Sequence, residues 1–146
     1  LIVGSALTIG NALTDEATGI TVLLKQILTP VFEGQSPLVF TITIVVIACV
    51  LTNICNNMVV GMLLIPIIHV FSQQIGAGSA AIACLSMYMV CIAVVTPAAS
   101  TTSAILHGNT KWLKIGDIYK YGILMSIISL IAVLAVGLPI ANIFFS

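Results

Sequence analysis

Three asparagines, Asn53, Asn56 and Asn57, lie close together in a part of the sequence that has no charged side chain. An asparagine side chain carries both a carbonyl acceptor and an NH₂ donor, so it can face a cation with one group and an anion with the other. A single asparagine in apolar surroundings often joins two helices by a hydrogen bond. Three together favour an ion-binding site, with helix joining as the alternative.

A second polar stretch covers residues 95–103 and contains Pro97 and five serine or threonine residues. Proline removes a backbone donor and clashes with the preceding turn, so a helix breaks or kinks there. A kinked helix whose hydroxyls bond to its own carbonyls would explain part of the pattern, but five hydroxyls exceed what a kink requires. We therefore expect a broken helix, whose free N–H end attracts anions and whose free C=O end attracts cations.

The rest of the chain is strongly apolar. Of its 146 residues 60% are hydrophobic, and its only charges are four lysines and four acidic residues. No charged residue lies between Glu33 and Lys111, or after Lys120. Soluble domains carry charge on roughly a quarter of their residues, whereas charge-free apolar runs of about 18 residues or more are candidate membrane spans. The composition predicts an all-α polytopic membrane protein fragment and excludes a nucleic-acid-binding module.

The asparagines separate two apolar stretches, Leu38–Leu51 and Met58–Phe71. At 1.5 Å per residue, 14 residues reach only about 21 Å, less than the roughly 30 Å of a bilayer core. Non-helical backbone at membrane depth is tolerated where it lines a cavity or is buried in protein. We therefore predict a re-entrant helical hairpin over residues 38–72, with a polar tip at residues 52–57.

The remaining segments complete a polytopic arrangement. The second polar stretch interrupts a discontinuous transmembrane helix, and the charge-free apolar run after Lys120 should bend at Gly137 and Pro139. The expected segments are the end of a spanning helix at 1–19, an interfacial helix at 20–33, the broken helix at 80–108 and a final spanning helix at 122–145.

The lysines predict how the chain is oriented. Lys111, Lys114 and Lys120 lie between the broken helix and the final span, and Lys25 lies on the other side. Cytoplasmic loops carry an excess of lysine and arginine. We therefore expect the 111–120 loop in the cytoplasm, and the C-terminus and the mouth of the hairpin outside.

The run Leu51–Met58, the Leu63-Leu64-Ile65-Pro66 that follows it, Thr96-Pro97 and Ser103–Gly108 together resemble a known family. They are similar to the divalent anion:sodium symporters, the bacterial and animal carriers of dicarboxylates, citrate and sulfate in the ion transporter superfamily. The resemblance covers nearly the whole chain, as the second of two inverted repeats. The family's Ser-Asn-Thr signature reads Asn56-Asn57-Met58 here.

The resemblance implies a sodium site and an adjoining anion site. The sodium ligands would be Thr52, the backbone at Cys55, Asn57, and the backbone carbonyls of Val95 and Pro97. The signature positions would contact a carboxylate of the anion, and the second polar stretch would line the same site. The residues expected at the substrate are Asn56, Asn57, Met58, Thr96, Pro97, Ser100 and Thr101.

The sequence therefore predicts a secondary active transporter of the plasma membrane that couples a small anion, such as a dicarboxylate, tricarboxylate or sulfate, to sodium. Coupling to protons through His69 or His107 is an alternative, because histidine titrates near neutral pH. An ion channel or a non-transporting scaffold is the rival class. An enzyme is less favoured, because HExxH and an intramembrane pair of aspartates are absent from the sequence. Expected partners are the anion, the bilayer, the first repeat and, by the resemblance, a second copy in a homodimer.

Overall fold

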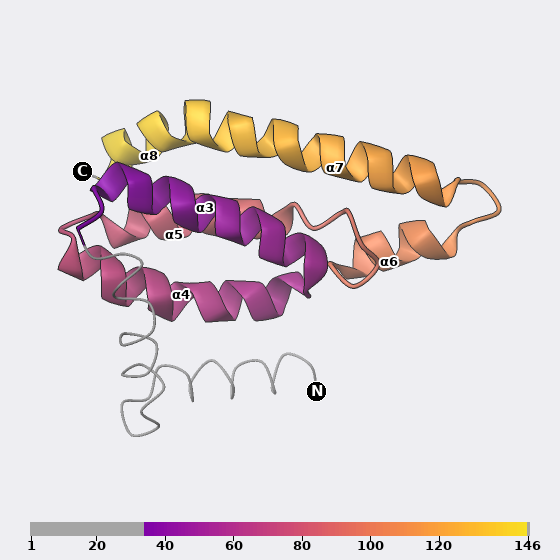
Figure 1. Ribbon diagram of the computed structural model, residues 1–146, viewed down its shortest axis with the longest axis horizontal. Helices are drawn as coiled ribbons and strands as arrows, with labels where there is room; N and C mark the ends of the chain where they lie inside the picture. The colour runs from indigo at the N-terminus through magenta and orange to yellow at the C-terminus, as the bar shows by residue number, and fades with distance from the viewer. Residues whose placement is uncertain (1–33, 146) are drawn as a thin grey trace, which may run out of the picture.

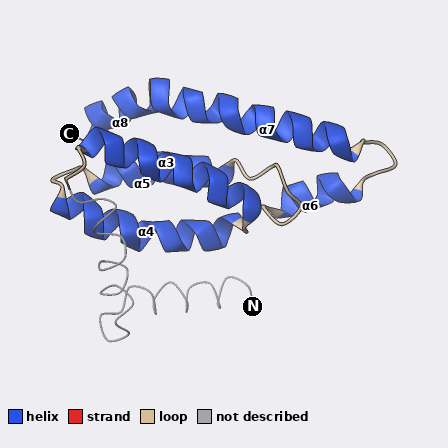
Figure 2. Ribbon diagram, viewed as in Figure 1, coloured by secondary structure: helices blue, strands red, loops and turns tan. Residues whose placement is uncertain are grey.

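The computed structural model describes residues 34–145, and this part of the chain is helical and contains no strand (Figure 2). The all-α prediction is therefore confirmed for these residues. The segments expected at 1–19 and 20–33 lie outside the described residues. The helices are α3 (Pro37–Ile54), α4 (Asn57–Gln74), α5 (Ser79–Cys91), α6 (Thr101–Gly108), α7 (Ile115–Ala132), the π-helical segment η2 (Val133–Gly137) and α8 (Leu138–Phe145).

Polar side chains set the starts of three helices. Ser36, Asn56 and Ser100 precede α3, α4 and α6, and each side-chain oxygen accepts a hydrogen bond from a first-turn N–H, at 3.4, 3.0 and 3.1 Å. Such caps satisfy backbone donors that the helix itself leaves free. Helix α4, the second arm of the hairpin, and helix α6, the second half of the broken helix, therefore each begin directly after a capping side chain.

Helices α3 and α4 run antiparallel, and both pack against α5 (Figure 1). One apolar core joins these three helices. Its largest fully buried side chains are Phe40, Ile44, Ile68, Phe71, Ile82 and Met89. Because α5 contacts both arms, the broken helix is fixed to the hairpin along the whole length of its first half.

The hairpin tip is shorter than the polar sequence predicts. Helix α3 continues through Ile54 and α4 begins at Asn57, so only Cys55 and Asn56 lie outside helices. The prediction of a non-helical turn from residue 52 to 57 was wrong at its ends, because Thr52 and Asn53 bond to another segment while their backbone stays helical.

Each hairpin arm therefore has 18 residues and spans about 27 Å. Three helices, Pro37–Ile54, Asn57–Gln74 and Ile115–Phe145, are long and apolar enough to cross a membrane. Arm length is thus close to the thickness of a bilayer core of about 30 Å. The re-entrant path of the hairpin stays a prediction.

The broken helix has its break at residues 92–100, slightly earlier than the expected 95–103. Helix α5 ends with a tightened turn in which Ile92 N–H donates to the Met89 carbonyl at 3.0 Å. Ser100 then caps α6, so the hydroxyl residues from Thr101 onward are helical. The polar run marked the break, but its capping residue decided where the helix resumes.

The last helix is longer than expected and forms one continuous rod from Ile115 to Phe145, 31 residues in all (Figure 1). The helix begins at Ile115, before the expected span of 122–145, because the polar turn carrying Asp117 is already helical and an acidic residue suits a helix N-terminus. Which part of the rod spans the membrane stays a prediction. In place of a simple bend, a π-helical segment, Val133–Gly137, precedes Pro139. Of the most apolar 18-residue stretch of the rod, only 11% is buried within the described structure.

The hairpin tip lies alongside this rod rather than beyond its end. The side-chain N–H of Asn53 donates to Ser126 Oγ at 3.3 Å. From Ser126 the rod extends back to Ile115, a rise of about 16 Å. The rod, α6 and the loop between them therefore project past the tip on one side (Figure 1).

The hairpin predicts a labelling pattern. In a protein with its native cysteines replaced, single cysteines at Gln35 and Gln74 should both react with an impermeant maleimide from the outer side, because an even number of crossings separates them. Reaction from opposite sides would contradict the hairpin.

A second label measures depth. A spin label at Asn56 should lie inside the bilayer by its collision rates with oxygen and with a water-soluble nickel chelate. A label at Asn109, in the loop between α6 and α7, serves as the control at the interface. If the two labels show equal depth, both arms cross completely and the re-entrant path is excluded.

Candidate ion-binding site at the hairpin tip and the helix break

Four helix ends meet at one place in the described structure. The tip joins the C-terminus of α3 to the N-terminus of α4, and the break joins the C-terminus of α5 to the N-terminus of α6 (Figure 1). Three hydrogen bonds between tip and break hold these ends together. A helix N-terminus carries partial positive charge and a C-terminus partial negative charge. The site therefore offers favourable surroundings for an anion and a cation within a short distance.

The tip and the break run beside each other between two cross-links. At one end, Asn53 Oδ1 accepts from Val95 N–H at 3.0 Å. At the other end, Asn57 N–H donates to the Ala99 carbonyl at 3.0 Å. Residues 54–56 of the tip consequently face residues 96–98 of the break, which brings both predicted halves of the site together.

Several oxygens between the cross-links have no hydrogen-bond donor. The backbone carbonyls of Cys55, Val95 and Pro97 accept no backbone or side-chain hydrogen bond within residues 34–145. Thr96 Oγ1 is buried and also has no partner among these residues. A buried polar atom without a partner, such as Thr96 Oγ1, is rare in proteins, and a bound ion or water is a usual explanation. Val95 is half-buried, and Cys55 and Pro97 are exposed. These oxygens are the ligand type that a hard cation takes.

Thr52 lies in the last turn of α3, just before the tip. Its side chain is fully buried, and its hydroxyl donates to the Val90 carbonyl at 2.7 Å. A hydroxyl that donates its one hydrogen still has lone pairs for a cation. The bond also fixes the last turn of α3 against the end of α5.

The side chains at the three signature positions differ in the hydrogen bonds that they already make within the described structure. Asn56 Oδ1 caps α4 through Met58 N–H at 3.0 Å, which leaves the Asn56 NH₂ group for other partners. The Asn57 side chain is half-buried and makes no hydrogen bond with any described residue. Met58 is 40% exposed. Asn57 therefore has the most available polar group at the tip.

Two serines of the second polar stretch shape the break. Ser100 Oγ donates to the Ala93 carbonyl at 2.6 Å and caps α6. Ser103 is fully buried, and its hydroxyl donates to the Thr96 carbonyl at 2.6 Å. Thr101, by contrast, is exposed in the first turn of α6. Of the predicted substrate residues in this stretch, Ser100 has its hydroxyl hydrogen-bonded to the backbone, whereas Thr101 is exposed and can contact a ligand.

Sequence reasoning missed the contribution of the last helix. Gly122 packs so closely on the break that an added Cβ would lie 3.1 Å from the Val94 carbonyl oxygen and 3.2 Å from Val95 Cα. Ser126, one turn further on, bonds to Asn53. The signal in the sequence was the spacing of Gly122 and Ser126 in an otherwise apolar helix, because small residues four apart let membrane helices approach closely.

The histidines lie outside the cross-linked region. His107 Nδ1–H donates to the Ser103 carbonyl at 2.8 Å, and the ring meets Tyr119 edge-on at 5.2 Å between centroids. His69 is exposed and lies 3.3 Å from Gln73. Within residues 34–145, no three His, Cys, Asp or Glu side chains group as metal ligands. A cation at the tip would therefore be held by neutral oxygens.

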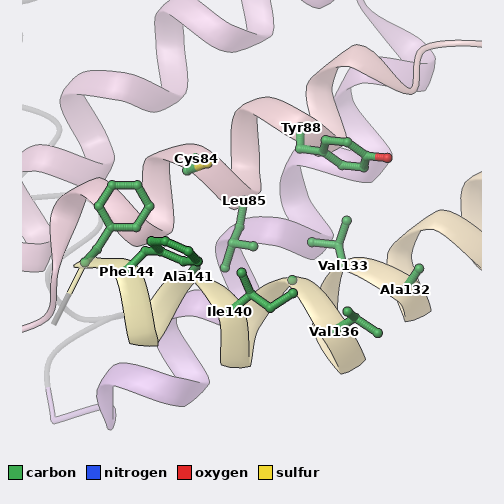
Figure 3. A pocket seen from close by; sticks show the side chains of 11 residues that line it. Cys84, Leu85, Tyr88, Ala132, Val133, Val136, Ile140, Ala141 and Phe144 are labelled. Carbon is green, nitrogen blue, oxygen red and sulfur yellow. The ribbon is translucent and has the colours of Figure 1, made fainter.

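A large apolar cavity in the described residues lies elsewhere. It has a volume of about 630 Å³ and opens between α5 and the η2–α8 part of the rod, where Leu85, Tyr88, Val133 and Ile140 line it (Figure 3). Its lining shares no residue with the tip or the break. Aliphatic and aromatic side chains dominate it, so it offers little to a small polar ion.

Comparison with known proteins identifies no family for this chain. No model of a known protein family matches the chain, and no curated protein matches its sequence. The resemblance to the divalent anion:sodium symporters therefore stays a prediction.

The close approach of Gly122 gives a stability prediction. Gly122→Ala should lower the free energy of unfolding by about 1–3 kcal/mol, because the new methyl group meets backbone atoms that cannot rotate away. Gly116→Ala, on the same helix with nothing within 4 Å of the added Cβ, is the matched control. It should stabilise the helix by up to about 1 kcal/mol. Thermal unfolding of the purified protein in detergent measures both, and equal midpoints would contradict the tight contact.

Proposed function

We propose that the chain is half of a secondary active transporter that moves a small anion together with a cation, sodium, across the plasma membrane. The observation that carries this proposal is the meeting of four helix ends at the tip and the break, with unpaired oxygens between them. Transporters bind substrate and coupling ion at the ends of such discontinuous helices.

The cation half of the site uses oxygen ligands. The carbonyls of Cys55, Val95 and Pro97 would supply three of them, and the hydroxyl oxygen of Thr52 and the side-chain carbonyl of Asn57 the others. The negative ends of α3 and α5 favour positive charge at this level. The lack of hydrogen bonds to the three carbonyls supports this assignment.

The anion half uses donors. The N-termini of α4 and α6 point toward the same region, and the NH₂ groups of Asn56 and Asn57 and the hydroxyl of Thr101 add donors there. Because the sequence has no arginine, a neighbouring cation would offset the charge of the anion. A dicarboxylate, a tricarboxylate or sulfate fits this donor set, with Met58, Thr96, Pro97 and Ser100 completing the lining.

The transport cycle would proceed by alternating access. A first repeat of the same protein would supply the facing half of the site, and two copies would form a homodimer. Lys120 lies 5.7 Å from the Tyr121 ring, and Trp112 is 85% exposed. Aromatic and lysine side chains gather at membrane interfaces, which supports an interfacial 111–120 loop. By the excess of lysine in cytoplasmic loops, this loop would face the cytoplasm and the C-terminus would lie outside.

The rival functions have weaker support. A channel filter is built from rings of carbonyls or charges that symmetry repeats, whereas the oxygens here belong to one asymmetric crossing. A serine hydrolase would use a hydroxyl beside a histidine, and Ser103 Oγ lies 3.4 Å from His107 Nδ1. That hydroxyl is buried and already donates to backbone carbonyls. It is therefore poorly placed to act as a nucleophile.

The coupling ion is tested in vesicles that contain the full-length protein. Uptake of radiolabelled citrate, succinate or sulfate should rise with external sodium and saturate, because the proposed sodium site becomes fully occupied at high sodium concentration. If uptake does not depend on external sodium and is lost when the proton gradient is removed, the coupling ion is the proton. His107 and His69 then become the candidate coupling residues.

Asn57 gives the sharper test of the site. Asn57→Asp nearly preserves shape, removes both donors and adds negative charge, so anion uptake per folded molecule should be lost while cation affinity survives or rises. Asn57→Ala should lose both. Gln73→Glu is the matched control, because it makes the equivalent amide-to-carboxylate change at an exposed position of the same helix, and it should transport normally.

If Asn57 only joins helices, the pattern is different. Each variant would then lose stability by about 0.6–2 kcal/mol, and the molecules that remain folded would transport normally. Normal turnover in Asn57→Asp would remove this residue from the site.

A further inference from the structure

Asn53 is the most completely bonded side chain at the tip. Its carbonyl oxygen accepts from Val94 N–H at 3.2 Å and from Val95 N–H at 3.0 Å. Its NH₂ group donates to the Cys49 carbonyl at 2.8 Å and to Ser126 Oγ at 3.3 Å. The side chain is 7% exposed. An asparagine amide has two donors and two acceptor sites, so Asn53 has none left for an ion.

The bonds of Asn53 link three parts of the protein. They connect the last turn of α3 to the break and to the long rod at Ser126. At the break, two successive backbone N–H groups converge on one oxygen. Such a pair forms a concavity that normally takes an anion or another strongly negative atom, and here Asn53 Oδ1 fills it. Lipid offers no acceptor in its place.

This arrangement constrains the backbone that carries one of the carbonyls of the proposed cation site. Because a peptide group is planar, holding the N–H groups of Val94 and Val95 fixes the two peptide planes that precede Val95 Cα. Only the φ and ψ angles of Val95 then separate a fixed plane from the Val95 carbonyl. Asn53 thereby limits where that carbonyl can lie, without contacting a bound ion.

We infer that Asn53 is a positioning residue for cation binding: its side-chain oxygen holds the break so that the Val95 carbonyl faces the ion site. The inference rests on the proposed function and deepens it. It separates two roles within the asparagine cluster, because Asn57 is free to contact ions whereas Asn53 organises the backbone that does so. The acceptor oxygen carries this role, and the NH₂ bond to Ser126 anchors it to the rod.

Three variants of the full-length protein in lipid nanodiscs separate these parts. Asn53→Leu removes the acceptor with little change in size. Asn53→Asp keeps an oxygen that accepts from both N–H groups in either protonation state. Ser126→Ala removes only the anchor on the rod and is the matched control for the loss of one side-chain contact of Asn53.

The first readout is hydrogen exchange of the peptide covering residues 92–100, which needs no transported ion. Asn53→Leu should speed exchange in this peptide, because the amides of Val94 and Val95 lose their acceptor. Asn53→Asp and Ser126→Ala should keep the wild-type protection. Unchanged exchange in a folded Asn53→Leu protein would overturn the role of Asn53 in holding the break.

The second readout is the sodium concentration that half-saturates uptake, compared with the maximal rate. Asn53→Leu should raise this concentration by at least about tenfold, because it leaves the N–H groups of Val94 and Val95 without their acceptor, and Asn53→Asp should restore it to near the wild-type value. A purely structural role would lower the amount of folded protein and leave the half-saturating concentration unchanged, which would overturn the inference.

The two readouts also distinguish failure of the inference from failure of the proposed function. If the wild-type protein shows no sodium response, both the sodium site and the positioning role in it are wrong, while hydrogen exchange still decides whether Asn53 holds the break. If sodium drives uptake and Asn53→Leu exchanges faster but keeps its sodium affinity, the proposed function stands and the positioning role is overturned.

Discussion

Peptide groups that leave a helix inside an apolar protein must find partners within the protein, because lipid supplies none. The break at residues 92–100 meets this constraint with side chains rather than with regular structure. Asn53 takes two of its N–H groups, and Ser100 and Ser103 donate to its carbonyls. What these bonds leave unpaired is therefore informative: the carbonyls of Val95 and Pro97 stay free beside the tip.

The sequence located the tip and the break because polar residues are conspicuous in a charge-free chain. It could not place their boundaries, because these depend on partners distant in sequence. Thr52 and Asn53 remain helical since they bond to Val90 and Val94, which lie about forty residues further along the chain. The partner of Gly122 could not be predicted for the same reason, since its tight contact exists only once the rod packs on the break.

The absence of arginine from the sequence shapes how such a site can recognise charge. Helix ends supply partial charges that are fixed by the fold and do not titrate. In the described structure, positive ends from α4 and α6 and negative ends from α3 and α5 meet at one level. Under the proposed function, cation and anion would each improve the surroundings of the other, which is the physical requirement for coupled binding.

Packing indicates which parts would move together in such a cycle. Helices α3, α4 and α5 share one buried core, so they are expected to shift as a body rather than slide past one another. By contrast, α6 buries only Ser103 and is attached to that body through the break. Because the free carbonyls lie between the cross-links formed by Asn53 and Ala99, and Asn57 forms one of these cross-links, a rigid displacement of the hairpin with α5 would carry both halves of the site at once. Coupling would then follow from the connectivity of the backbone, without a separate signal between the ions.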